Sequence, residues 1–140
     1  MKQPDQDRQM ELIEPIFWDD EKFSVGNELL DSQHHTLVAT LNEIIICLRV
    51  GDAPISKLFF EFQNKAVQHL RKEERLLVQS GYPELQEHLT EHYEYEDRIA
   101  YIIVDGVRGQ ERNVVSFLKD WWEHHVLEDD MAYKERLLSH

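Results

Sequence analysis

Histidine and carboxylate side chains that can bind metal ions recur at helical spacings along four segments of the chain. In sequence order they are His34, His69, Glu73, His88, His92, His125 and Asp130. Five imidazoles and two carboxylates form a donor set that suits a pair of transition-metal ions. Seven donors also exceed the four ligands that a structural zinc site needs, so a purely structural zinc bundle is the least favoured interpretation.

The spacing between these residues indicates how they face. His69 and Glu73 are four residues apart, as are His88 and His92, so each pair projects from one face of a helix on successive turns. His125 and Asp130 are five apart, which rotates the second residue by about 140° on a continuous α-helix. The sequence therefore predicts a break in the helix near residues 127–129, after which Asp130 turns back toward the core.

The candidate ligands lie within apolar series that have the period of a helix. The four series are Leu30, His34, Leu37, Leu41, Ile44 and Leu48; Leu58, Phe62, Ala66, His69, Glu73 and Leu76; Leu85, His88, His92, Tyr95, Ile99 and Ile102; and Val114, Leu118, Trp121 and His125. Each candidate on these series occupies a position that would otherwise be hydrophobic. Metal coordination would remove the cost of burying them, and the alternative for any one histidine is an ordinary core residue with a hydrogen-bond partner.

Glycine and proline residues that mark turns indicate where the helices that carry these residues begin and end. We expect helices over about 27–50, 55–79, 84–105 and from 110 to just after His125. Short connections between long amphipathic helices predict antiparallel neighbours, and hence an all-α, up-down-up-down four-helix bundle over residues 27–140 with a short segment after the fourth helix. Residues 1–26 lack a long period and read as an arm that packs on the bundle through Ile16, Phe17, Trp18 and Phe23.

Composition agrees with one domain and excludes several classes of function. A chain of 140 residues can bury a core without disulfides, and the single cysteine, Cys47, cannot form an internal one. The net charge of −13 argues against binding to nucleic acid or to an anionic membrane surface. The apolar run of residues 44–48 is far shorter than the roughly 20 residues of a membrane span. The charged N-terminus has no apolar stretch of a signal peptide, so we expect a cytoplasmic protein.

Several segments in this order resemble the hemerythrin family, in its single-domain bacterial form. They are Trp18, Phe23-Ser24-Val25-Gly26, Asp31-Ser32-Gln33-His34, His69-Leu70-Arg71-Lys72-Glu73-Glu74, Tyr82-Pro83, His88-x3-His92, Trp121 and His125-Val126-x3-Asp130. The resemblance covers nearly all of the chain except about the first fifteen residues and the last few. A single HxxxH motif would be weak evidence, whereas all of these segments in this order are highly specific.

The resemblance implies a non-haem di-iron centre that binds dioxygen reversibly. In the family's pattern His88, His92 and His125 would bind one iron, and His34 and His69 would bind the other. Glu73 and Asp130 would bridge both ions, together with an oxo or hydroxo group derived from solvent. The iron with two histidines would keep an open position for dioxygen. The implied role is oxygen storage, delivery or scavenging, with a reductant or an oxygen-accepting protein as an unknown partner.

Three positions depart from the family's pattern around the expected dioxygen pocket. Leu70 and Tyr95 stand where phenylalanines are usual, and Trp122 stands where a leucine is usual. We hypothesise that Trp122 narrows the pocket and that Tyr95 places a hydroxyl near it. The alternative is that these rings pack elsewhere.

Neighbouring polar residues are not assigned to the metals. Glu74 follows Glu73 but points about 100° away on the helix, so it is either a surface residue or a support for a ligand. The other three histidines, His35, His124 and His140, do not lie on the inward series.

Two other functions remain open. One is a sensor in which oxygenation alters a partner contact, with the arm of residues 1–26 as the element that would respond. The other is an enzyme, such as a peroxidase or a di-iron protein that reduces NO or nitrite. Oxygen carriage is favoured over catalysis because the chain lacks the carboxylate-rich Glu-x-x-His pattern of the usual di-iron bundles.

Overall fold

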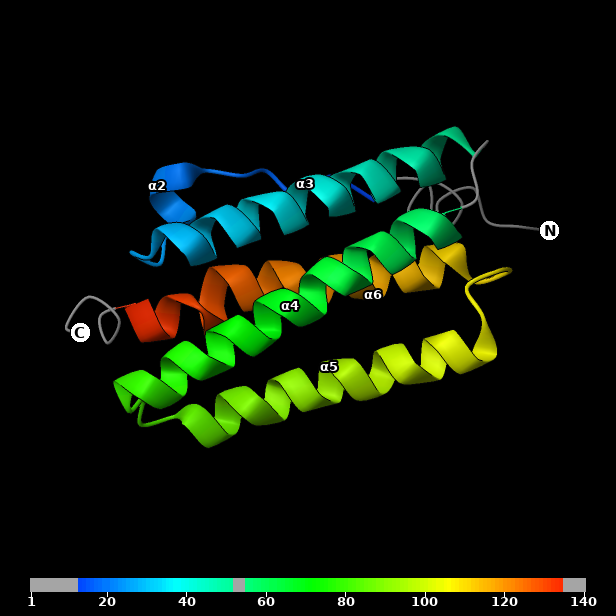
Figure 1. The fold of residues 1–140 in the computed structure, drawn as a ribbon. Helices are drawn as coiled ribbons and strands as arrows, with labels where there is room; N and C mark the ends of the chain where they lie inside the picture. The colour runs from blue at the N-terminus through cyan, green and yellow to red at the C-terminus, as the bar shows by residue number, and fades with distance from the viewer. Residues whose placement is uncertain (1–12, 52–54, 135–140) are drawn as a thin grey trace.

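Four long helices make up most of the protein. The computed structural model describes residues 13–51 and 55–134. The long helices are α3 (Glu28–Val50), α4 (Ser56–Ser80), α5 (Leu85–Asp105) and α6 (Glu111–His124) (Figure 1). The described residues contain no strand, so the predicted all-α class with four long helices is confirmed, with boundaries within a residue or two of those expected.

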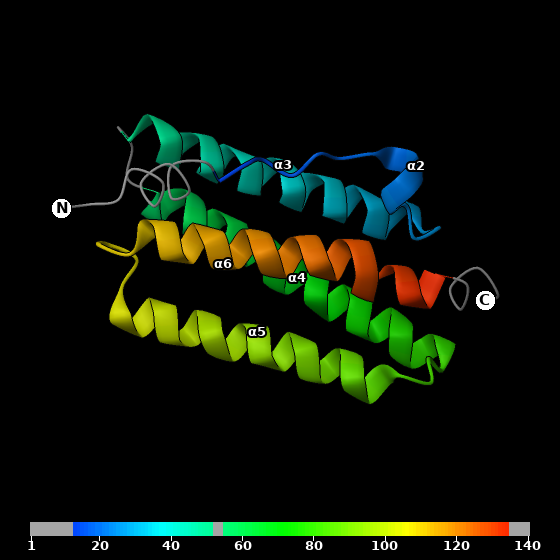
Figure 2. The ribbon, with the colours of Figure 1, turned by 180° about the vertical axis from the view of Figure 1, so that it is seen from behind.

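The helices lie side by side along a common direction. Both views of the ribbon show the chain reversing its direction from each long helix to the next (Figures 1 and 2). Helix α3 packs against α4 and α6, and α4 packs against α5. Side chains from all four helices can therefore meet in the interior.

Local signals fix where the first helices begin and end. Asn27 caps α3, since its side-chain oxygen accepts a hydrogen bond from the N–H of Leu30 at 3.0 Å. Gly51 ends α3 and Gly81 ends α4, with left-handed φ values of 77° and 67°. Glycine adopts this conformation without the steric cost of a Cβ atom, so both helices stop at these residues.

The apolar core has two parts, and the candidate ligands lie between them. The larger part includes Leu37 of α3 and Leu70 of α4, and the smaller part includes Leu30 of α3 and Leu77 of α4. His34 and Glu73 fall between these positions on their own helices. The bundle therefore surrounds a polar interior layer with apolar packing on both sides.

The arm lies along α3, with the short helix α2 (Asp20–Phe23) near the beginning of α3 (Figures 1 and 2). Ile16 and Phe23 are buried, and the Trp18 ring packs edge-on against Phe23 at 5.2 Å between centroids. The expectation that Phe17 also packs on the bundle is wrong, because its side chain is 80% exposed. Consecutive residues of an extended segment point in opposite directions, so burial of Ile16 turns Phe17 outward.

Asn42 holds the arm through both of its side-chain polar groups. Its oxygen accepts a hydrogen bond from the N–H of Ile16 at 2.8 Å, and its amide group donates to the carbonyl oxygen of Ile16 at 2.9 Å. The part of the arm before residue 13 lies outside the described residues.

Among the described residues, none of the helices combines the length and the hydropathy that crossing a membrane requires.

Candidate metal centre

The seven predicted ligands meet in the middle of the bundle, and none of them exposes more than 4% of its surface. They form two groups that share one residue. Glu73, His88, His92 and His125 make up the first group; His34, His69, Glu73 and Asp130 make up the second. Within each group the potential donor atoms lie within 4.8 Å of one another, which is close enough for one metal ion. The structure therefore brings together every residue that the helical spacing singled out.

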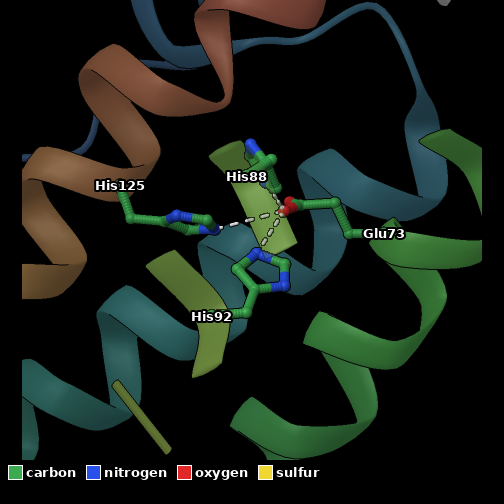
Figure 3. A group of neighbouring side chains, drawn as sticks. All are labelled: Glu73, His88, His92 and His125. Atoms are coloured by element: carbon green, nitrogen blue, oxygen red, sulfur yellow. Dashed lines mark hydrogen bonds and ion pairs between the residues drawn. The ribbon is translucent and has the colours of Figure 1, made fainter. Parts of the chain in front are cut away.

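Glu73 of α4 faces both groups with different oxygens. Its Oε1 lies 2.9 Å from Nε2 of His92 and 3.3 Å from Nε2 of His125, and it also contacts Nε2 of His88. Figure 3 shows these three imidazoles pointing toward the Glu73 carboxylate. The other oxygen, Oε2, lies 3.2 Å from Nε2 of His69 and 3.8 Å from Nε2 of His34. One carboxylate thus separates three histidines from two.

Asp130 divides its oxygens in the same way. Oδ2 lies 2.7 Å from Nε2 of His34, in the two-histidine group. Oδ1 lies 3.0 Å from Nε2 of His125 and 3.6 Å from Nε2 of His88, in the three-histidine group. Both carboxylates therefore span the two groups, as a pair of bridging ligands would.

The turn after α6 explains how Asp130 reaches this position. The α-helix ends at His124, close to the expected position, but the expected break at residues 127–129 is wrong, because the chain continues as a π-helix over His125–Asp129 and then as a 3₁₀-helix over Met131–Tyr133. The N–H of Asp130 donates to the carbonyl oxygen of His125 at 2.8 Å, five residues back. A π turn brings residues five apart into register, so both side chains face inward without interrupting the helix.

Opposite charges stabilise one another in the cluster when no metal is bound. Burial alone would lower the pKa of His34, but Asp130 and Glu73 outweigh it and raise this pKa to about 9. Burial would likewise raise the pKa of Glu73, but His125, His34 and His69 hold it well below its ordinary value. For His69 burial prevails, and its pKa is lowered. Protons therefore supply positive charge at the point where cations would sit.

The donor set fits metal ions better than it fits a hydrogen-bonded core. Nε2 of His34 and Nε2 of His69 lie only 3.0 Å apart and point at the same space. Among the described residues, no donor makes a hydrogen bond of good geometry to either carboxylate oxygen of Asp130. Imidazole nitrogens and carboxylate oxygens that converge without enough donors are the environment in which a divalent transition metal binds.

Two of the imidazoles have partners behind them that fix their orientation. Nδ1 of His69 donates to Oε1 of Gln33 at 2.9 Å, and Nδ1 of His92 donates to Oε2 of Glu74 at 2.7 Å. Each bond leaves Nε2 as the lone-pair nitrogen that faces the centre. Partial burial opposes ionisation of Glu74, but its bonds with His92 and Arg71 keep its pKa below the ordinary value. The sequence left open whether Glu74 is a surface residue or positions a ligand, and the structure favours the second role, toward His92.

Tyr133 belongs to the site, although the sequence did not single it out. Its buried hydroxyl donates to Oε2 of Glu73 at 3.0 Å. Burial and the nearby carboxylates of Asp130 and Glu73 raise the pKa of Tyr133 well above its ordinary value, so this hydroxyl remains a donor. The spacing of three residues from Asp130, close to one helical turn, was the one available signal.

The three residues assigned to a dioxygen pocket are all buried. The ring of Trp122 lies 5.5 Å from the ring of His125 and 6.0 Å from that of His69, measured between centroids. Its Nε1–H donates to the hydroxyl of Tyr95 at 3.0 Å, and that hydroxyl donates to Oε1 of Gln63 at 2.9 Å. Leu70 lies in the larger apolar core. Trp122 thus packs beside both groups, while the Tyr95 hydroxyl is engaged elsewhere; their role toward dioxygen stays a prediction.

The remaining histidines do not join the centre. His35 and His124 are exposed, and His140 lies outside the described residues. The ring of His35 packs instead near Trp18 of the arm, at 5.7 Å between centroids.

Comparison with known proteins agrees with this geometry. The model of the hemerythrin HHE cation-binding domain matches residues 25–137. The chain is similar to a bacteriohemerythrin of Stenotrophomonas maltophilia (strain R551-3), with 23% identity over 89% of this chain and 83% of that protein. It is also similar to a myohemerythrin of Riftia pachyptila (28% identity; 91% and 98% covered) and to a hemerythrin-like protein of Naegleria gruberi (28%; 86% and 92%). No solved structure matches significantly.

Proposed function

Because the chain belongs to the hemerythrin family, we propose that it binds dioxygen reversibly at a pair of iron ions and serves in oxygen storage, delivery or scavenging. The observation that carries this proposal is the unequal division of histidines by two carboxylates. Glu73 and Asp130 each direct one oxygen toward the three-histidine group and the other toward the two-histidine group.

We assign the ligands accordingly. His88, His92 and His125 would hold one iron, His34 and His69 would hold the other, and Glu73 and Asp130 would contribute one oxygen to each. Three imidazoles and two carboxylate oxygens give the first ion five protein donors, while the second has four. The smaller number of protein donors would leave the second ion able to take dioxygen as a further ligand.

The chain's own residues would make this chemistry reversible. When bound, the iron pair supplies the two electrons that dioxygen takes up and returns on release. Five neutral imidazoles and only two carboxylates give a less anionic set than the carboxylate-rich di-iron sites, which favours release over oxidation of a substrate. The buried position of all seven ligands restricts water, which should slow loss of the reduced state.

Optical spectroscopy and metal analysis test the proposal together. Protein loaded with iron should contain two irons per chain, and after anaerobic reduction it should develop a charge-transfer band in air that disappears on evacuation. One iron per chain would contradict the two-metal assignment. A permanently oxidised product would contradict reversible binding, and repeated turnover with reductant would indicate an enzyme instead.

Oxygen sensing is a second candidate because the arm contacts the residues that support the site. The N–H of Val25 donates to Oδ1 of Asp31 at 2.8 Å, and the fully buried Val25 side chain shares an apolar cluster with Tyr133. Tyr133 in turn donates to Glu73. A change in the bridging carboxylates can therefore reach the end of the arm through two contacts.

Hydrogen exchange distinguishes sensing from simple carriage. A sensor should show a change in the exchange of residues 16–25 between the reduced and the oxygenated states. The connection after α5, residues 106–110, provides an internal control that does not contact the site. Equal exchange of the arm in both states would exclude sensing through the arm.

A further inference from the structure

His92 and His69 each have a side-chain partner on Nδ1, and these two partners differ in charge. On the three-histidine side, Nδ1 of His92 donates to the carboxylate of Glu74 at 2.7 Å. On the two-histidine side, Nδ1 of His69 donates to the neutral amide oxygen of Gln33 at 2.9 Å. The bridging carboxylates are shared by both groups, so this pair of outer contacts is an electrostatic difference between the two sides.

Glu74 is held in a fixed position by a basic residue. Its Oε1 accepts a hydrogen bond from Nη1 of Arg71 at 2.5 Å, and Nη2 of Arg71 contacts Oε1 of Glu96 on the neighbouring helix α5. One oxygen of Glu74 is therefore committed to Arg71 and the other to His92. This arrangement spans α4 and α5, in a surface groove that both glutamates and His92 line.

A carboxylate acceptor changes an imidazole more than an amide acceptor does. The anionic oxygen draws the Nδ1 proton away from the ring, which leaves more electron density on Nε2, whereas a neutral amide oxygen does this less. A more electron-rich ligand stabilises the ferric ion relative to the ferrous ion. Of these two imidazoles, His92 on the three-histidine side would therefore be the stronger donor.

We infer that Glu74 is a positioning residue that strengthens His92 as a ligand and directs the first oxidation to the iron of the three-histidine group, leaving the two-histidine iron ferrous. The inference rests on the proposed function, since it concerns the same pair of ions. The two ions would then differ in function. The iron of the three-histidine group would hold the ferric state more readily, and the iron of the two-histidine group, which dioxygen reaches, would stay reduced for longer.

Redox titration of the iron-loaded protein tests the inference with three isosteric variants. Glu74→Gln keeps the acceptor and removes its charge, and Gln33→Glu adds a charge behind His69. Glu96→Gln is the matched control, because it removes a nearby charge that contacts Arg71 but not His92. Outer partners of metal ligands typically change affinity by about 10- to 100-fold.

We expect Glu74→Gln to favour the ferrous state at one of two one-electron steps by about tenfold or more, which corresponds to about 59 mV. Gln33→Glu should shift the other step in the opposite direction, and Glu96→Gln should shift neither by a comparable amount. Equal shifts in Glu74→Gln and Glu96→Gln would overturn the inference, because charge alone would then account for them. So would unchanged potentials in Glu74→Gln.

Proton NMR of the zinc-loaded protein gives a second measurement that needs neither iron nor dioxygen. The Nδ1–H resonance of His92 should lie at lower field than that of His69, and the order should reverse in the double variant Gln33→Glu/Glu74→Gln. An unchanged order in the double variant would overturn the inference. If the parent protein held two irons and these tests failed, the inference about Glu74 would be wrong but the proposed function would stand. If the parent protein held only one iron, the proposed function and the assignment of two irons would both be wrong.

Discussion

The hydroxyl of Tyr133 lies 3.0 Å from Oε2 of Glu73, a residue 60 positions earlier in the chain. The contact joins the segment after α6 to the second half of α4, beside the imidazoles of both groups. It gives Glu73 a neutral donor in addition to the histidines, which limits how far this carboxylate can rotate.

Removal of this donor should weaken the centre without unfolding the protein. Tyr133→Phe leaves a buried carboxylate oxygen without its hydroxyl partner, which typically costs about 1–3 kcal/mol. We expect faster loss of iron to a chelator and a lower free energy of unfolding in urea. Tyr93→Phe, on the exposed face of α5, is the matched control. Iron retention equal in both variants would show that Tyr133 does not support Glu73.

The two-metal assignment predicts a specific change in stoichiometry. His69→Ala removes one of only two imidazoles from the second group, so we expect it to retain close to one iron per chain instead of two. His35→Ala, at an exposed histidine, should retain both. Measurement of iron by elemental analysis after gel filtration checks this. Two irons in His69→Ala would mean that His69 is not a ligand.

Trp122 should slow autoxidation by filling the space beside His69 and His125. Trp122→Leu leaves a cavity and removes the indole N–H that donates to the Tyr95 hydroxyl. We expect the free energy of unfolding to fall by about 3 kcal/mol. Water should then reach the site, and the oxygenated form should decay faster. The rate of loss of its optical band measures this. An unchanged rate would remove Trp122 from any gate.

Tyr95, which packs beside Trp122, allows the contribution of a hydroxyl group to be tested apart from that of its ring with the variant Tyr95→Phe. It leaves the ring volume unchanged but deprives both Trp122 and Gln63 of a partner. Because the hydroxyl already donates to Gln63, we expect a loss of about 1–3 kcal/mol in stability with little change in dioxygen affinity. The exposed Tyr101→Phe is the control. A large change in affinity would show that the hydroxyl reaches the ligand.

Stability of the metal-free protein should fall as the pH rises from about 6.5 to 9. The folded-state pKa of His34 is raised from 6.5 to about 9, so its contribution is complete below pH 6.5 and is lost as the pH passes through about 9. That difference corresponds to about 3 kcal/mol. Charging of His69, whose pKa is lowered, affects stability only at lower pH. Urea unfolding across this range measures the slope.

A rise in stability over that range would contradict the sign of the His34 interaction, and His34→Gln should flatten the slope. Metal affinity should show the opposite trend. Because binding displaces the proton from His34, the affinity should increase with pH until about 9.

The bundle and the ligand positions could be predicted because they depend on one periodicity. His34, His69 and His88 lie on their helices at the same phase as the apolar residues around them, and that phase follows from 3.6 residues per turn. The four long helices were predicted within a residue or two for the same reason. The assignment of iron to these positions depends on the family and stays a proposal.

The features that the sequence did not predict depend on contacts between helices or on backbone conformations other than the α-helix. Gln33 and Glu74 are off the inward series, and only the packing of neighbouring helices brings them to His69 and His92. Phe17 resembles its buried neighbours in type but faces outward, because an extended segment alternates its side chains. The predicted break before Asp130 was wrong because the rotation argument assumed α-helical winding, and the wider π turn satisfies the same requirement.

That wide turn also determines where the molecule would come apart first. A π turn is rarely adopted without an external constraint, and here Asp130 at its end faces the imidazoles with which it would share the metal ions. Stripping the metal with a chelator should therefore expose the chain around residues 126–133 to proteases before any of the four long helices is cut. Asp130, a proposed ligand, and Tyr133, which donates to Glu73, would be released together because they lie on the same short segment.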